Sequence, residues 1–231
     1  MIWPFSRPAL PPLDAAGSAR RAALARQEID LKRPLADMRW CVVDVETGGL
    51  DAARDPLLAI GAVAIERGRI VLDASLEVGL TQAQSTAAAN ILIHGIGGSE
   101  QRAGQAPHEA LLDWLEFSRG APRVAFHAAF DQAGLQRAVR AQLGLAIDAP
   151  RFDASVVAPL LFPDAAPHCR HLDDWLAHFG IAVYARHGAL ADAYATAELW
   201  LILLQAAQRD NIATAHQLRG LLRARRWLSV H

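Results

Sequence analysis

The clearest strand signal in the chain is a short apolar run at residues 40–45, which reads Trp-Cys-Val-Val-Asp-Val and is followed by Gly48-Gly49. The run is rich in β-branched residues and is bounded by turn residues, so it predicts a buried central strand. Two further apolar runs, 58–65 and 69–78, flank the charged turn Glu66-Arg67-Gly68 and predict a hairpin. A short strand is expected at 124–126.

Apolar residues at helical spacing predict helices through the rest of the chain. These helices are expected at residues 108–117, 128–142, 155–161, 172–179, 190–208 and 213–227. Residues 1–13 are rich in proline, whereas residues 14–35 are rich in Ala, Arg and Glu and predict a helical arm that ends at Pro34. A sheet that begins with a hairpin, followed by strands alternating with helices, indicates a mixed α/β fold.

Composition excludes several classes of protein. The 231 residues are 52% apolar and 20% charged, which suits one full domain with an additional segment. The 23 basic and 24 acidic side chains give a net charge of -1, so the chain is not a strongly basic nucleic-acid binder. Cys41 and Cys169 are too few for a disulfide framework. No stretch has the roughly 20 apolar residues of a membrane span, and the first residues do not read as a signal peptide, so we expect a cytoplasmic protein without membrane contact.

Two carboxylates interrupt the apolar pattern at the end of the first strand. Asp44 and Glu46 stand two positions apart, so both side chains project from the same face. Hard oxygen ligands on one face suit Mg²⁺ or Mn²⁺, whereas the alternative is a solvated strand end with ordinary acids. A phosphatase of the Asp-x-Asp type is disfavoured because position 46 is Glu.

Two other groups are ambiguous when each is taken alone. Asp131 stands at the start of a predicted helix, where an acid is stabilised by the helix dipole without any further role. His187 precedes Gly188 in a predicted loop, and Asp192 lies in the first turn of the long helix that follows. A loop histidine beside an acid at a helix start is often without chemical significance.

The order of the three groups is more specific than any one of them. The motifs read Val43-Asp44-Val45-Glu46-Thr47-Gly48-Gly49-Leu50, Phe126-His127-Ala128-Ala129-Phe130-Asp131 and His187-Gly188-Ala189-Leu190-Ala191-Asp192. In this order they resemble the DEDDh 3′–5′ exonucleases, the DnaQ-like branch of the RNase H-like superfamily. The resemblance covers residues 40–208, although the family often has His-Asn where this chain has Phe126-His127.

The resemblance implies an RNase H-like exonuclease fold, an α/β fold with a central mixed sheet flanked by helices, and the predicted arm adds an N-terminal helical extension to it. It divides the chain into an N-terminal segment and arm (1–38), an exonuclease domain (39–209) and a C-terminal Arg-rich helix (210–231). The arm and the last helix match nothing in the family pattern, so we expect the arm to dock or to form a dimer.

The resemblance also implies a set of site residues. Asp44, Glu46, Asp131 and Asp192 would hold two divalent ions, Mg²⁺ or Mn²⁺, and His187 would act as the general base. Thr47, Leu50, Ile93 and His94 would contact the terminal nucleotide. Three of these contacts have a simpler alternative: Thr47 as a turn residue, Leu50 as a core residue and His94 as a loop histidine bonded to backbone.

The expected substrate is the 3′ end of a single-stranded nucleic acid, DNA in preference to RNA, with nucleoside 5′-monophosphates as products. The expected protein partner is a polymerase or, through the arm, a second copy of the chain. Two other functions stay open at this point. One is a non-catalytic nucleic-acid-binding or polymerase-associated module on the same fold, and the other is a small-molecule phosphohydrolase.

Overall fold

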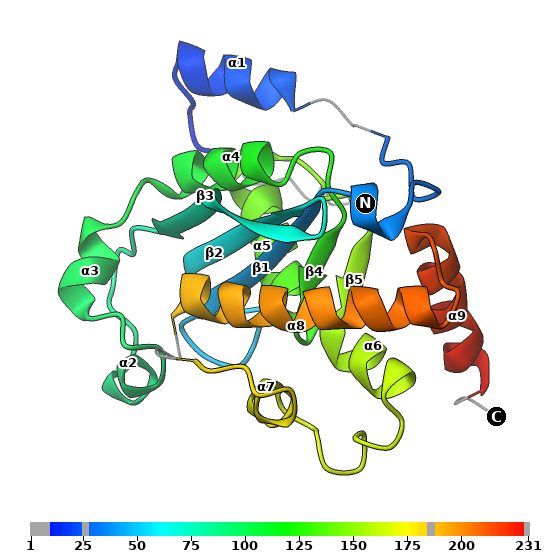
Figure 1. Ribbon diagram of the computed structural model, residues 1–231. Helices are drawn as coiled ribbons and strands as arrows, with labels where there is room; N and C mark the ends of the chain where they lie inside the picture. Colours follow the sequence, from blue (N-terminus) through cyan, green and yellow to red (C-terminus); the bar gives the residue numbers. More distant parts are fainter. Residues whose placement is uncertain (1–9, 25–27, 184–187, 229–231) are drawn as a thin grey trace, which may run out of the picture.

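The fold is built on a mixed sheet with the strand order β3-β2-β1-β4-β5 (Figure 1). The computed structural model describes residues 10–24, 28–183 and 188–228, without the side chains of residues 93–94 and 225–228. Within these residues the strands are β1 (Trp40–Thr47), β2 (Leu57–Glu66), β3 (Arg69–Gly79), β4 (Arg123–Ala125) and β5 (Arg151–Asp153). Strand β2 pairs antiparallel with both β1 and β3, whereas β4 pairs parallel with β1 and β5 pairs parallel with β4.

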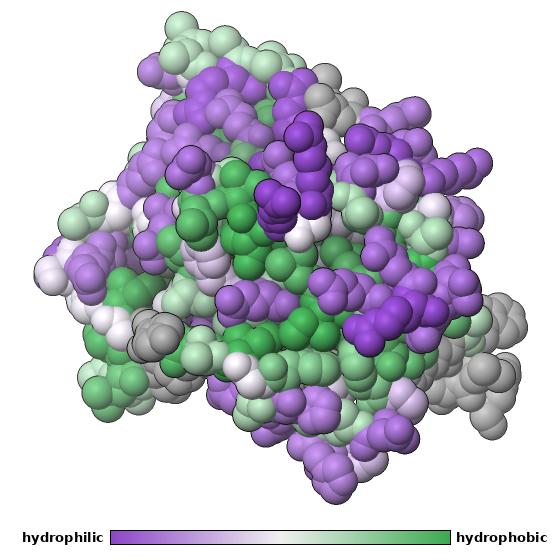
Figure 2. All heavy atoms as spheres, in the orientation of Figure 1, coloured by the Kyte–Doolittle hydropathy of each residue, from purple (hydrophilic) through white to green (hydrophobic). Residues whose placement is uncertain are grey.

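Helices cover both faces of this sheet. Helix α8 (Ala189–Arg209) lies across one face, and α4 (Pro107–Phe117) and α5 (Ala128–Leu143) pack on the other (Figure 1). The remaining described helices are α1 (Ala15–Ala23), α2 (Ala88–His94), α3 (Gly98–Ala103), α6 (Ala154–Leu161), α7 (Leu172–His178) and α9 (Ala215–Leu228), with a 3-10 turn, η1, at Leu35–Asp37. Hydrophilic side chains dominate the surface between α1 and α4, whereas apolar side chains reach the surface at α2 (Figure 2).

The alternation of side chains along β1 divides the core into two layers. Trp40 and Val42 belong to the cluster that includes α8, whereas Cys41, Val43 and Val45 belong to the cluster that includes α4 and α5. This division follows from the two-residue period of a strand. The sequence therefore decides which helical layer each side chain of β1 meets.

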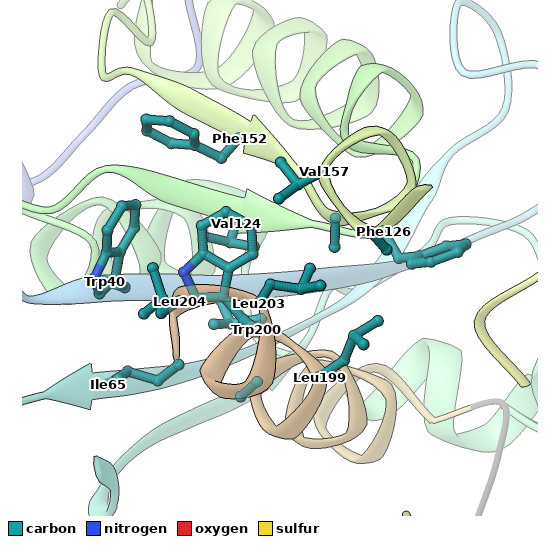
Figure 3. Packing of buried hydrophobic residues seen from close by; sticks show 14 of the residues in the cluster. Trp40, Ile65, Val124, Phe126, Phe152, Val157, Leu199, Trp200, Leu203 and Leu204 are labelled. Carbon is teal, nitrogen blue, oxygen red and sulfur yellow. The ribbon is translucent and has the colours of Figure 1, made fainter. Parts of the chain in front are cut away.

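Aromatic side chains fill the layer between the sheet and α8. The ring of Trp40 lies 5.3 Å from that of Phe152 and 5.3 Å from that of Trp200, both in edge-to-face geometry (Figure 3). Such pairs contribute about 1 kcal/mol each beyond the area that they bury. These contacts join the first strand, the last strand and the long helix into one core.

The prediction of one continuous helix over residues 14–35 is wrong. Helix α1 ends at Ala23, and the side chain of Asp30 forms a turn by accepting a hydrogen bond from the Lys32 N–H at 2.9 Å. Pro34 has no N–H to extend a helix. Leu35, directly after it, is buried in the core, so the chain turns inward here.

The segments before and after the predicted domain (39–209) contact each other. The His216 N–H donates to the Leu31 carbonyl at 2.8 Å, and the Leu35 N–H donates to the Ala213 carbonyl at 2.9 Å. Leu35 and Leu218 also belong to the same buried cluster. The arm and the start of α9 therefore pack as part of one folded unit.

The sequence pattern does not predict the short elements β5, α2 and α3. Strand β5 has three residues, and α3 begins at Gly98 and contains few apolar side chains, so neither gives a recognisable period.

Among the described helices, none combines the length and the apolar character that crossing a membrane requires.

Arg20 of helix α1 joins this helix to α4 of the same chain. Arg20 forms ion pairs with Glu109 at 2.6 Å, Asp113 at 2.5 Å and Glu116 at 2.8 Å. We expect Arg20→Ala to release α1, because three carboxylates on one face of α4 would then lack their shared cation. The cost to global stability should be only about 1 kcal/mol, since the pairs are partly solvated. Hydrogen exchange of residues 15–23 should rise in Arg20→Ala but not in the neighbouring variant Arg21→Ala, and equal protection in both variants would contradict this docking.

Candidate active site

The α8 face of β1 changes from apolar to acidic near the end of the strand. Trp40 and Val42 are buried on this face, and Asp44 and Glu46 continue the same alternation as half-buried carboxylates. Asp44 and Glu46 therefore share one face of β1, as their spacing predicts, and this face is the one toward α8 rather than the one toward α4 and α5. Both acids lie where the central strand approaches the start of α8.

A glycine allows the first turn of α8 to rest directly on the sheet. Gly61 of β2 is the register partner of Asp44. A Cβ atom on Gly61 would lie 2.1 Å from the carbonyl carbon of Ala189 and 2.1 Å from the nitrogen of Leu190. Only glycine permits this approach of backbone to backbone, and the approach brings the start of α8 beside Asp44.

Asp192 completes a compact acidic group. It lies in the first turn of α8, is 8% exposed, and has one carboxylate oxygen within 4.8 Å of an oxygen of Asp44 and an oxygen of Glu46. Three carboxylates at this separation repel one another strongly unless a cation neutralises them. The donor set consists of hard oxygens, which Mg²⁺ and Mn²⁺ prefer, so these residues fit a divalent ion.

Asp131 approaches from the opposite helical layer. It lies in the first turn of α5, is 5% exposed, and accepts a hydrogen bond from the Val45 N–H. Val45 follows the paired part of β1 and β4, whose last register pair is Val42 with Val124. Asp131 lies near Glu46 and Asp153, but it is not part of the group formed by Asp44, Glu46 and Asp192.

Burial dominates the electrostatics of Asp131. Desolvation, reinforced by the neighbouring carboxylates of Asp153 and Glu46, raises the pKa of the Asp131 carboxyl to about 8, although backbone hydrogen bonds oppose the shift. At neutral pH the metal-free protein therefore keeps the Asp131 carboxyl protonated, and a cation bound there would have to displace this proton. Asp153 itself was not recognised in the sequence, because it ends a strand too short to predict.

The predicted nucleotide contacts lie around the end of β1. The Thr47 hydroxyl donates to the Gly49 carbonyl at 2.7 Å, which is the turn role, and Leu50 is 91% exposed rather than a core residue. Ile93 and His94 are the last two residues of α2, and their side chains lie outside the described residues. The Asn90 side chain of α2 donates to the Gly48 carbonyl, so α2 adjoins this loop.

The predicted general base, His187, lies outside the described residues. Gly188, which follows it, is the N-cap of α8, and its carbonyl accepts the Asp192 N–H at 2.9 Å. In the sequence His187 therefore stands two positions before Ala189, the first residue of the helix that carries Asp192.

We expect Gly61→Ala to weaken Mn²⁺ binding by about 10–100-fold, because α8 must move away from the sheet and take Asp192 with it. Backbone atoms at 2.1 Å cannot yield as a flexible side chain does, so the variant should also lose about 1–3 kcal/mol of stability. The matched control is Gly134→Ala in α5, where an added Cβ meets nothing within 4 Å. Calorimetric Mn²⁺ titration of both variants provides the measurement, and unchanged affinity in Gly61→Ala would contradict the packing argument.

The raised pKa of Asp131 predicts the pH dependence of the metal-free protein. The unfolded chain ionises this group near 3.8, whereas the folded protein retains the proton up to about pH 8. Its contribution to the free energy of unfolding is therefore fully present below pH 3.8 and is lost as the pH rises toward 8, by about 1.4 kcal/mol per pH unit at most. Asp131→Asn should abolish this loss and be more stable than the wild type at pH 8 in the presence of a chelator. Denaturant unfolding at several pH values measures the slope, and equal slopes in the two proteins would refute the assignment.

A family model described as exonuclease, of the RNase T type, matches residues 41–200. This match spans most of the chain, including all four acids and His187. The chain therefore belongs to the DnaQ-like exonuclease family, and the region that carries the acidic group is a nuclease domain.

Two relatives have similar sequences over most of this chain. The DNA polymerase III subunit epsilon-like protein of Rhodobacter capsulatus is 31% identical over 204 residues, which cover 87% of this chain and 28% of the relative. The PolC-type DNA polymerase III of Caldanaerobacter subterraneus is 28% identical over 186 residues, which cover 80% of this chain and 13% of the relative. The chain thus corresponds to little more than a quarter of the first relative and about an eighth of the second.

Solved structures share the fold. Escherichia coli exonuclease I in complex with a dA16 oligonucleotide superposes with a TM-score of 0.64 at 16% identity, over 75% of this chain and 42% of that one. Exonuclease X in complex with 5′-overhanging duplex DNA superposes with a TM-score of 0.61 at 18% identity, over 79% and 99% of the two chains. The predicted exonuclease fold, with its mixed sheet flanked by helices, is confirmed.

Proposed function

We propose that this chain is a metal-dependent 3′–5′ exonuclease that hydrolyses the terminal phosphodiester bond of single-stranded DNA and releases nucleoside 5′-monophosphates. The observation that carries the proposal is the meeting of Asp44, Glu46 and Asp192, whose carboxylate oxygens lie within 4.8 Å of one another at the end of β1 and the start of α8. Asp131, buried beside Glu46, is the fourth proposed acid. The order of these residues along a chain of this family supports the same assignment.

The four acids would hold divalent ions, for which we propose two Mg²⁺ or Mn²⁺. Bound together, two such ions stabilise the charge on the attacking and leaving oxygens of an in-line displacement. The chain supports this chemistry by fixing its carboxylates on rigid elements. Asp44 and Glu46 stand on the central strand, and Asp192 stands on a helix that rests on Gly61.

His187 is the proposed general base that removes a proton from the attacking water. An imidazole suits this role because its ordinary pKa lies close to neutral pH. Its position in the sequence, next to the N-cap of α8, links it to the helix that carries Asp192.

Exposed apolar side chains support a nucleotide-binding role for the loop after β1 and for α2. Leu50 is 91% exposed and Leu92 is 88% exposed, and apolar side chains gather at the surface of α2 (Figure 2). Nucleobases offer flat apolar faces to such groups. We assign Leu50, Ile93 and His94 to contacts with the last nucleotide, and Thr47 to a contact with the sugar of that nucleotide. In the structure, the Thr47 hydroxyl donates to the Gly49 carbonyl.

The names of the relatives support DNA as the substrate and a polymerase as the partner, since both are named for DNA polymerase III. A homodimer through the arm is the alternative, although α1 already docks on α4 of its own chain. For the chain as a whole we propose the division into residues 1–38, 39–209 and 210–231, in a cytoplasmic protein.

The nuclease, the binding module and the phosphohydrolase make different predictions in one assay. The full chain would be incubated with labelled single-stranded DNA, double-stranded DNA, RNA and a nucleoside monophosphate, each with Mn²⁺ and with chelator. The proposal predicts metal-dependent release of 5′-mononucleotides from single-stranded DNA without further dephosphorylation. Binding without release would favour the module, and faster turnover of the monophosphate would favour the phosphohydrolase.

A further inference from the structure

Asp153 makes hydrogen bonds to two different helix starts. It is the last residue of β5 and the N-cap of α6, where its Oδ1 accepts the Ser155 N–H at 3.0 Å and the Ser155 hydroxyl at 2.6 Å. The same oxygen accepts the His127 N–H at 3.0 Å, across from β5 to the end of β4. The first two bonds are ordinary capping, whereas the third bond reaches a neighbouring strand–helix junction.

That junction has an unusual backbone. His127 is the N-cap of α5 and has φ 63° and ψ 45°, the left-handed region that non-glycine residues avoid. Its carbonyl accepts the Phe130 N–H at 3.0 Å, which closes the first turn. A strained residue keeps its conformation only where the surroundings hold it, and the Asp153 carboxylate holds the His127 N–H.

The start of α5 determines the position of Asp131, which lies four residues after His127 in the first turn of this helix. Its carboxylate is buried and accepts the Val45 N–H, so a small change in where α5 begins would remove it from the end of β1. Asp153 itself is not part of the group formed by Asp44, Glu46 and Asp192 among the described residues. Its oxygen Oδ1 is already shared among three donors.

We propose that Asp153 is a positioning residue for the active site: by holding the His127 N–H, it fixes the start of α5 and so the place of Asp131. This inference rests on the proposed metal-dependent function. The Asp153 carboxylate would then have two roles. As the N-cap of α6 it would affect only stability, and as the acceptor of the His127 N–H, here called the clamp on α5, it would also affect metal binding.

The structure supplies matched variants that separate these two roles. Asp153→Ala removes the acceptor, whereas Asp153→Asn keeps an acceptor oxygen and removes the charge. His127→Gly lets the junction adopt a positive φ without strain, so it should compensate for the lost clamp. Asp174→Ala is the control at a distant helix start, because Asp174 accepts the Arg170 and His171 N–H groups at 2.9 and 2.8 Å before α7.

The test is calorimetric Mn²⁺ titration of each full-length variant without substrate, beside thermal unfolding and the Mn²⁺ dependence of nucleotide release. We expect Asp153→Ala to weaken Mn²⁺ binding by about tenfold or more, Asp153→Asn to stay within about threefold of the wild type, and His127→Gly to restore much of the affinity in the Asp153→Ala background. Asp174→Ala should lower the melting temperature without changing the Mn²⁺ affinity. If Asp153→Ala only lowers the melting temperature, or if His127→Gly gives no rescue, Asp153 is a helix cap and the inference is wrong. A wild-type chain that binds no Mn²⁺ would overturn the proposed function instead, and this inference with it.

Discussion

Asp44→Asn and Asp192→Asn are each expected to lower nucleotide release by about 10³-fold or more. Under the proposed function each change removes an oxygen ligand from the metal site, whose ions would stabilise the transition state by several kcal/mol, and each 1.4 kcal/mol corresponds to a tenfold change in rate. Mn²⁺ affinity should fall in parallel. The metal-free variants should be no less stable than the wild type, because each substitution relieves repulsion among carboxylates that lie within 4.8 Å.

The control for this prediction is Glu198→Gln. Glu198 is an exposed carboxylate on α8, the helix that carries Asp192, so the substitution changes the charge without touching the acidic group. Its activity and Mn²⁺ affinity should match those of the wild type. Full activity in Asp44→Asn or Asp192→Asn would show that the acidic group is not the metal site.

His187→Ala is expected to lower turnover by about 10²–10⁴-fold, the range typical for loss of a general base. Mn²⁺ binding should stay nearly intact because all four carboxylates remain. Wild-type turnover should rise through the pKa of the imidazole, and the residual rate of His187→Ala should lack this inflection. Calorimetric titration and pH–rate profiles provide the two measurements.

His168→Ala is the control for the histidine prediction, since His168 is an exposed histidine in the segment between α6 and α7. It should retain both the rate and the inflection. If His187→Ala weakens Mn²⁺ as strongly as Asp44→Asn does, His187 is a metal ligand and its assignment as the base is wrong.

The parts of the site that the sequence predicts are those that depend on local periodicity. The alternation from Trp40 to Glu46 places both acids on one face of β1, because a strand has a period of two residues. The first turn of a long helix is similarly easy to predict from its apolar repeat, and this gives the position of Asp192.

The other parts depend on contacts between distant segments, which no local pattern reports. Gly61 matters because the backbone of α8 rests on it, more than 120 residues later in the chain. Asp131 approaches the end of β1 from the helical layer opposite to α8. The order of the motifs along the chain does not reveal that Asp131 stands apart from the group formed by Asp44, Glu46 and Asp192. Asp153 ends a strand of three residues, and the arm turns inward at Leu35 because burial there outweighs helix propensity.

We propose above all that this chain removes nucleotides from a 3′ end with the help of divalent metal. The most direct test of this proposal is the degradation of a single-stranded DNA labelled at its 5′ end, followed over time with Mn²⁺, with chelator, and with Asp44→Asn in place of the wild type. The account predicts a ladder of progressively shorter labelled strands that requires both Mn²⁺ and Asp44. Immediate release of the labelled terminal nucleotide, or a ladder that persists in chelator or in Asp44→Asn, would contradict it.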